Sequence, residues 1–195
     1  MTLLAHAPPT DEALMRAWLG GREAAFAELV ARHGLAVKSF ALRMLRDEAQ
    51  AEEVYAETFL RVAAGRWQPT GSARGWIFTV ARRLCLDLLR QRRTARENVP
   101  HLVELNWGAP PSNPESQTLA AEQASWLEAG LARLPEEHRE VLLLRVVHGM
   151  SAAEVGEVLG LAEHQVHSQV SYARKRLRAL LEEASEQGAE REGRR

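Results

Sequence analysis

SAAEVGEVLGLAEHQVHSQVSYARKRLRALL, residues 151–181, predicts two helices joined by a tight corner. Ser151 and Glu154 have the spacing of a capping box, in which each side chain accepts a hydrogen bond from the other residue's backbone N–H. Gly160 follows the apolar residues of the first helix and suits the left-handed backbone that ends a helix. The second helix begins directly after this corner, so the stretch predicts a helical hairpin.

Apolar residues follow the second helix at the 3.6-residue period and form one stripe that must face a core. They are Val166, Val170, Ala173, Leu177 and Leu181. At about 100° per residue, the opposite side carries hydrogen-bonding side chains first and cations later. The side chains on that face are His164, His167, Ser168, Ser171, Lys175 and Arg178, with Tyr172 and Arg174 at its flanks.

Two interpretations fit this hairpin. A DNA-binding helix-turn-helix needs such a layout, because the N-terminal part of its second helix enters the major groove while phosphates lie along the flanks. An ordinary helical hairpin with a solvated charged face has the same pattern, and helix-turn-helix patterns produce false positives. DNA binding is therefore a hypothesis, with the plain hairpin as its alternative.

Charge and cysteine content limit the class of protein. The chain has 195 residues, enough for one domain or two small ones, and a formal net charge of -1. Any nucleic-acid surface must therefore come from segregated charge. The single cysteine, Cys85, excludes an internal disulfide and a cysteine-based metal cluster. With neither a signal-peptide pattern nor a run of about 18 apolar residues, we expect a cytoplasmic protein without membrane insertion.

Residues 74–96 concentrate the positive charge, with seven arginines against one acidic residue, Asp87. In the helix expected after the cap Ser72, an apolar stripe marks the buried side and the opposite face is basic. That face carries Thr79, Arg82, Arg83, Arg90 and Arg93. Arginine pairs bidentately with phosphate, so the face suits nucleic acid, and the alternative is a solvated face.

The loop before this helix, residues 65–75, has the sequence GRWQPTGSARG. Its glycines and proline are typical of a loop. Trp67 is either an anchor or a stacking platform for an unpaired base, and Arg74 lies at the end of the loop. A loop of this kind beside an arginine face favours nucleic acid that includes unpaired bases.

An acidic face is predicted on the helix that Asp47 caps, EAQAEEVYAETFLRVAAG. Its exposed side holds Glu52, Glu53 and Glu57. Glu57 and Arg61 stand at i, i+4 and can form a surface pair, so solvation is one interpretation of the face and docking of a partner is the other.

Proline and glycine residues divide the chain into two helical parts. Pro100, Pro110, Pro111 and Pro114 mark a stretch that cannot stay helical. We expect an all-α fold, with two small helical domains joined by a flexible Pro-rich linker and a helix-turn-helix in the C-terminal domain. The expected parts are a disordered N-terminus over 1–9, a first domain over 10–96 that Thr10 or Asp11 begins, a linker over 97–116, a second domain over 117–181 and a disordered tail over 182–195.

Three blocks of the sequence, in this order, resemble the extracytoplasmic-function (ECF) group of bacterial RNA polymerase sigma factors. They are RMLRDEAQAEEVYAETFLRV at 43–62, GWIFTVARRLCLDLLRQRR at 75–93 and LPEEHREVLLLRVVHGMSAAEVGEVLGLAEHQVHSQVSYARKRLRALL at 134–181. The resemblance covers roughly residues 11–181. It implies a protein that binds core RNA polymerase, recognises the promoter -10 and -35 elements and promotes DNA melting for transcription initiation.

The resemblance also implies roles for residues. Glu52, Glu53 and Glu57 match the part that docks on the clamp of the largest polymerase subunit. The part that opens the -10 element and holds flipped bases matches Trp67, Arg74, Thr79, Arg82, Arg83, Arg90 and Arg93. The part that reads the -35 element matches the helix-turn-helix. Its matching residues are His164, Gln165, His167, Ser168, Ser171, Tyr172, Arg174, Lys175, Arg176 and Arg178. An anti-sigma factor is implied as the partner that masks these surfaces.

The recognition helix departs from the family pattern. It has HQVHSQVSYARKRLR where the family commonly has a threonine, Val-Lys-Ser and arginines. Ala56 and Arg83 likewise replace the common glutamine and asparagine. A neutral His167 attracts phosphate less near pH 7, so the later cations of this helix must supply the attraction.

Catalytic and cofactor motifs are missing from the sequence. The seven histidines lack an HExxH pattern, and no phosphate loop or nucleophile elbow is present. His164 and His167 have no third metal ligand nearby, so we expect neither an enzyme nor a cofactor. Two alternatives to a sigma factor are a stand-alone helix-turn-helix regulator, which would dimerise and bind duplex DNA by itself, and a sigma-like helical module that binds only protein.

Overall fold

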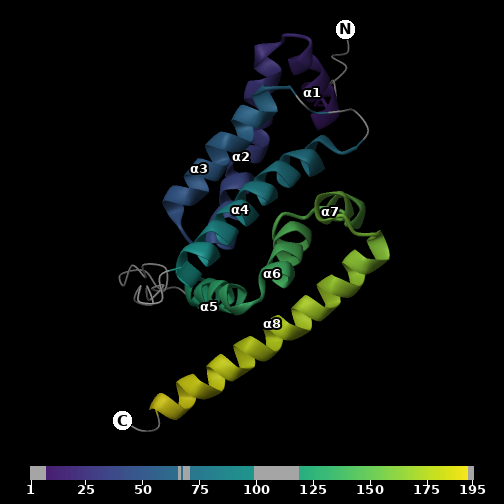
Figure 1. Ribbon diagram of the computed structural model, residues 1–195. Helices are drawn as coiled ribbons and strands as arrows, with labels where there is room; N and C mark the ends of the chain where they lie inside the picture. Colours follow the sequence, from purple (N-terminus) through teal and green to yellow (C-terminus); the bar gives the residue numbers. More distant parts are fainter. Residues whose placement is uncertain (1–7, 66, 68–70, 99–118, 193–195) are drawn as a thin grey trace.

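The computed structural model describes residues 8–65, 67, 71–98 and 119–192, and every regular element within these ranges is helical (Figure 1). The all-α prediction is confirmed for this part of the chain. The helices form an N-terminal and a C-terminal domain. The expected linker, 97–116, starts in the last turn of the fourth helix, and its remainder lies outside the described ranges.

Four helices build the N-terminal domain, and three of them begin at a capping side chain. They are α1 (Asp11–Leu19), α2 (Glu23–Leu45), α3 (Glu48–Ala63) and α4 (Ala73–Asn98). The side-chain oxygens of Thr10, Asp47 and Ser72 accept hydrogen bonds from the backbone N–H three residues later, at 3.2, 3.0 and 3.1 Å. The predicted caps are therefore confirmed. Between the helices, Val37 and Phe40 of α2 pack with Ile77 and Phe78 of α4 in the core.

The C-terminal domain contains a π-helical turn besides its four α-helices. Its elements are α5 (Leu119–Arg133), α6 (Glu136–Leu142), the π turn η1 (Leu143–Val147), α7 (Ala152–Leu159) and α8 (Glu163–Glu192). The π turn adds a residue to the turn that ends α6. The backbone N–H of His148 closes it by donating to the Leu143 carbonyl at 2.9 Å. His148 is therefore the C-cap of this π turn.

The corner between α7 and α8 has the predicted helix-turn-helix form. Ser151 and Glu154 form the reciprocal capping box, with hydrogen bonds of 3.1 and 2.8 Å. Gly160 ends α7 at a φ of 71°, and the Leu161 N–H returns to the Gly156 carbonyl at 2.9 Å. A Cβ at Gly156 would lie 2.5 Å from the Leu161 oxygen, so the backbone of the corner packs directly against α7.

The inward stripe of α8 is confirmed at Val166, Val170 and Ala173, which are buried. The helix continues to Glu192, beyond Leu181, so residues 182–192, which were expected to be part of a disordered tail, are helical. The added residues, EEASEQGAERE, include several strong helix formers, which favours this extension.

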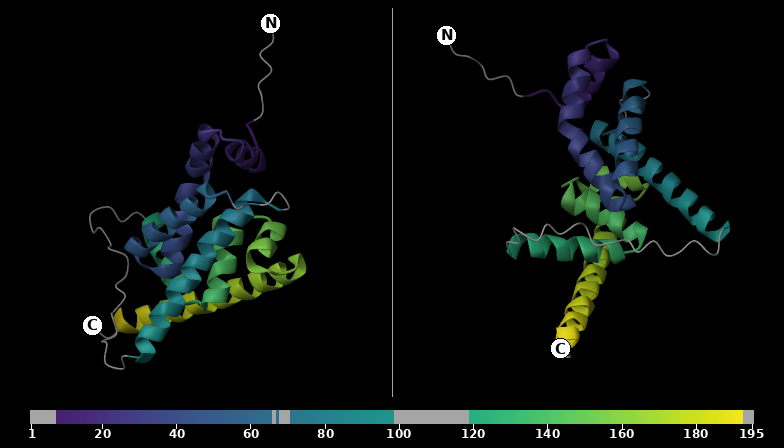
Figure 2. Two further views of the ribbon diagram at one scale, coloured as in Figure 1. Left: turned by 45° about the horizontal axis from the view of Figure 1, so that its top comes forward. Right: turned by 90° about the vertical axis from the view of Figure 1, so that its left-hand side faces the viewer.

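The two domains pack against each other along α4. In both views of Figure 2, the green C-terminal helices lie directly beside the teal α4, and α4 is in contact with α7. Helix α6 lies between α4 and the long α8, which runs along the far side of the C-terminal domain (Figure 1). Arg82 and Arg93, which lie on the side of α4 opposite its buried stripe, therefore meet the C-terminal domain.

Candidate nucleic-acid interfaces

The outer face of α8 presents all ten side chains predicted to read the -35 element. We call them the recognition face: His164, Gln165, His167, Ser168, Ser171, Tyr172, Arg174, Lys175, Arg176 and Arg178. Every one of them is exposed. The buried stripe packs the other side of α8 against the domain. The recognition face can therefore enter the major groove of DNA while the domain stays folded.

Three residues of the recognition face have partners within the domain. The Gln165 side chain accepts from the Ala162 N–H at 2.9 Å and so caps the start of α8. The Ser168 hydroxyl donates to the His164 carbonyl at 3.0 Å. The Tyr172 ring packs against His138 of α6, with ring centroids 4.9 Å apart. If the Gln165 side chain contacted a base instead, α8 would lose this capping hydrogen bond.

The outer face of α4, defined as Thr79, Arg82, Arg83, Arg90 and Arg93, is the α4 arginine face. Arg83 and Arg90 are exposed, and Arg90 pairs with Asp87 on its own helix at 2.6 Å. The Thr79 hydroxyl donates to the Gly75 carbonyl at 2.9 Å, so it serves the helix in this arrangement.

Arg82 of the α4 arginine face is paired across the domain junction. Its Nε and Nη2 donate to the two carboxylate oxygens of Glu140 on α6, at 2.7 and 2.9 Å. The Glu140 side chain is only 8% exposed and that of Arg82 is 23% exposed. This bidentate geometry is the one by which arginine also binds phosphate.

Two further arginines predicted to bind DNA reach the C-terminal domain. The Arg74 guanidinium donates to the backbone carbonyl of His148 and lies over the Phe78 ring, 5.9 Å from its centroid. Arg93 approaches Glu136 of α6 at 3.7 Å. The predicted -10 surface is therefore divided between solvent and the junction.

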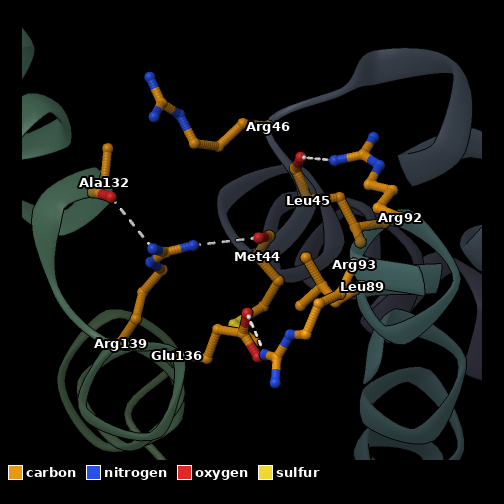
Figure 3. Close-up of a pocket in the computed structure, with 9 residues that line it drawn as sticks. All are labelled: Met44, Leu45, Arg46, Leu89, Arg92, Arg93, Ala132, Glu136 and Arg139. Carbon is orange, nitrogen blue, oxygen red and sulfur yellow. Dashed lines mark hydrogen bonds and ion pairs between the residues drawn. The ribbon is translucent and has the colours of Figure 1, made fainter. Parts of the chain in front are cut away.

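A pocket of about 240 Å³ opens at this junction (Figure 3). Arg139 lies on one side of it, where its Nη1 donates to the Met44 carbonyl at the end of α2, at 3.1 Å. The same guanidinium donates to carbonyls at the end of α5, including that of Ala132 at 3.0 Å. Burial, and secondarily the charge of Arg46, lowers the Arg139 pKa. Arg139 thus joins the ends of two helices from different domains.

Trp67 lies in the core of the N-terminal domain. It is 5% exposed and belongs to the cluster of buried hydrophobic residues. A base cannot stack on this ring in the observed conformation, which corrects the stacking-platform interpretation. The alternative interpretation, an anchor for the loop, fits its burial.

The acidic face of α3 is on the outside of the N-terminal domain. Glu52 and Glu53 are exposed, and Glu57 is partly exposed. Glu52 pairs with Lys38 of α2, and Glu57 pairs with Arg61 at 2.7 Å in the expected i, i+4 geometry. Both ion pairs are open to solvent and can be exchanged for a partner at little cost.

No sequence pattern predicted a role for the junction residues Glu136, Arg139, Glu140 and His148. Neither charge pattern nor spacing distinguishes Glu140, which is buried, from its exposed neighbour Glu137. The difference arises from tertiary packing, which places Arg82 opposite only one of them.

Comparisons with known proteins cover both surfaces. The model of sigma-70 region 2 matches residues 29–95, which include the α4 arginine face, and the model of sigma-70 region 4 matches residues 124–177, which include most of α8's recognition face. ECF RNA polymerase sigma factor SigL of Mycobacterium tuberculosis is 34% identical over 191 residues, which cover 94% of this chain and 97% of SigL. RNA polymerase sigma factor CnrH of Cupriavidus metallidurans is 32% identical over 185 residues, which cover 90% of this chain and 96% of CnrH.

Solved structures share the fold. CnrH in complex with the cytosolic domain of CnrY matches with a TM-score of 0.66 and 29% identity, over 88% of this chain and 97% of CnrH. The sigma factor RpoE in complex with the anti-sigma factor NepR, from Bartonella quintana, has the same TM-score at 22% identity, over 80% of this chain and 96% of that chain, which is a likeness of fold alone.

None of the described helices is long and apolar enough to cross a membrane. The two region matches, and relatives above 30% identity along almost the whole chain, agree with the two surfaces that the helices build. The chain belongs to the ECF group of RNA polymerase sigma factors.

Proposed function

We propose that this sigma factor directs core RNA polymerase to promoters by reading the -35 element with α8 and holding the melted -10 strand with α4. The observation that carries the proposal is the segregation of charge on a chain with a net charge of -1 into two surfaces that suit DNA. In this proposal the protein is a binding subunit and not an enzyme, and it acts in the cytoplasm, where polymerase and promoter are present.

The recognition face would contact the upstream duplex. Its N-terminal half offers hydrogen-bonding groups to base edges, and its C-terminal half offers Arg174, Lys175, Arg176 and Arg178 to phosphates. The domain carrying it is proposed to extend over 117–181, after a linker at 97–116. About 20 residues of linker reach at most roughly 60–70 Å, so the two domains can contact sites separated by more than one turn of duplex.

The -10 strand would be held by the N-terminal domain, proposed over 10–96. Arg74, Arg82, Arg83, Arg90 and Arg93 are the proposed contacts to its backbone and flipped bases, with Thr79 beside them. An unstacked base costs a few kcal/mol unless it is captured, so a basic surface at this place favours the melted state. Trp67 supports the loop from the core in this scheme and makes no contact with DNA.

Polymerase would dock on the acidic face of α3, through Glu52, Glu53 and Glu57. This face lies on α3, whereas both DNA surfaces lie on α4 and α8, so polymerase and promoter can be bound together. An anti-sigma factor is the proposed regulator. The solved complex of CnrH with the cytosolic domain of CnrY supports a protein partner of this chain.

An Arg90→Ala variant tests whether α4 holds the melted -10 strand while α8 binds the -35 duplex. Bacterial core polymerase and a promoter library are mixed with each protein, and bound and melted promoters are counted separately. We expect Arg90→Ala to retain bound promoters and to lose melted ones, because duplex contacts on α8 remain. Arg16→Ala removes an exposed cation of α1 as the matched control and should change neither count. Equal loss of both counts in Arg90→Ala would contradict the assignment of α4.

A further inference from the structure

The pocket of about 240 Å³ in Figure 3 has a strongly basic lining. Its charged lining residues are Arg46, Arg92, Arg93, Arg139 and Glu136. We propose that this pocket binds a small phosphorylated anion, of the size of pyrophosphate or of the diphosphate group of a nucleotide. The inference goes beyond the proposed function and does not depend on it, since the pocket shares only Arg93 with the proposed DNA contacts.

Arg139 forms one wall of the pocket, and its guanidinium is held by carbonyl oxygens. It donates to the carbonyls of Leu131, Met44, Ala132 and Leu134, at 3.0, 3.1, 3.0 and 2.8 Å. A guanidinium has five N–H donors, so one donor on Nη1 is left without an acceptor among the described residues. Because these four acceptors are neutral, Arg139 brings a fixed positive charge to the pocket.

Arg46 adds a second cation at the end of α2. Its backbone is left-handed, with a φ of 56°, at a helix end where glycine is the usual residue. Within the described residues, its guanidinium makes neither a hydrogen bond nor an ion pair. An arginine is therefore placed here at some backbone strain, and its charged group is available to a ligand.

Arg46 and Arg139 repel each other across the pocket. Figure 3 shows their guanidinium groups on the same side of it. Burial lowers the Arg139 pKa, and the nearby charge of Arg46 lowers it further. An anion between the two groups would replace this repulsion with two attractions.

The other charged lining residues leave the pocket positive. Arg93 is 3.7 Å from Glu136, longer than a direct hydrogen bond, and its side chain is 66% exposed, so it can turn toward an anion. Arg92 is anchored by the Leu45 carbonyl at 2.7 Å and by Asp47 at 2.9 Å. Glu136 is thus the one carboxylate that lines the pocket, against four guanidinium groups.

Pocket size and lining limit the ligand to a small group. A volume of about 240 Å³ is below the range of roughly 300–1,000 Å³ that drug-sized ligands occupy, so a phosphate group or two can enter but not a whole nucleotide. Met44, Leu89 and Ala132 contribute apolar lining, which strengthens attraction between arginine and phosphate. Arginine binds phosphate bidentately, which favours a phosphorylated anion here.

Isothermal titration calorimetry of the full chain, at constant ionic strength, tests the proposal with inorganic pyrophosphate and, separately, with adenosine diphosphate. Arg46→Gln removes the cation that has no partner. Ala132→Leu fills the pocket and leaves every charge in place, so it is a second, independent test. Arg16→Gln is the matched control, because Arg16 is an exposed arginine of α1 outside the pocket.

We expect pyrophosphate to bind wild type and Arg16→Gln equally, to bind Arg46→Gln about ten-fold more weakly, and not to bind Ala132→Leu. The melting temperature of wild type should rise with pyrophosphate, because the ligand binds the folded state. Binding of pyrophosphate alone would identify a free anion as the ligand, whereas binding of adenosine diphosphate alone would identify a nucleotide. If wild type binds neither compound, or if Arg46→Gln and Ala132→Leu bind as wild type does, the proposal is overturned.

Discussion

At the scale of single residues, Gly156 is where the helix-turn-helix is most tightly packed. A methyl group there would meet the Leu161 carbonyl at 2.5 Å, which forces the corner to shift. We expect Gly156→Ala to lower the free energy of unfolding by about 1–3 kcal/mol, measured by urea denaturation. Gly20→Ala is the control, because its Cβ would meet the nearest atom at an ordinary 3.4 Å. Equal effects of the two changes would show that the corner is not constrained.

His148 is the residue whose protonation should affect domain packing. Burial, with the nearby charges of Arg43 and Arg74, lowers its pKa from 6.5 to about 4. A group with a lower pKa in the folded state binds fewer protons there, so its contribution is complete above pH 6.5 and is lost as the pH falls toward 4. We expect the urea midpoint of wild type to fall more between pH 7 and pH 5 than that of His148→Phe. Parallel pH dependences would rule out this role.

At the scale of elements, α8 should bind duplex DNA through its cations largely independently of sequence. Lys175→Ala is expected to weaken duplex binding and to reduce the slope of log affinity against log salt by about 1, because one phosphate contact is lost. Fluorescence anisotropy of holoenzyme on a labelled promoter, at several salt concentrations, measures both quantities. Arg16→Ala should leave the slope unchanged. A slope that Lys175→Ala does not alter would remove this residue from the interface.

Local sequence signals predicted the elements well. Caps at Thr10, Asp47 and Ser72 were recognisable because a capping side chain acts on a backbone group only three residues away. The buried stripe of α8 followed from helical periodicity alone. Trp67 was ambiguous, since composition does not say whether a loop aromatic turns inward. Its burial depends on tertiary packing, which places it in the hydrophobic core.

At the scale of the whole molecule, the junction between the domains could not be predicted from the sequence. Arg82 and Glu140 are 58 positions apart, and each belongs to a helix whose own pattern is complete without the other. Periodicity placed Arg82 correctly on the outer face of α4. It could not tell that a second domain would cover part of that face, because an ion pair across domains leaves no local pattern.

Promoter melting is the most direct test of the central claim, that one chain brings polymerase to a promoter and holds its opened strand. Purified protein, bacterial core polymerase and a promoter from the library selection are combined, and unpaired thymines are detected with permanganate. We expect reactive thymines at the -10 element only when both proteins are present. Duplex binding by the protein alone, without core binding or melting, would contradict it and would identify a stand-alone helix-turn-helix regulator.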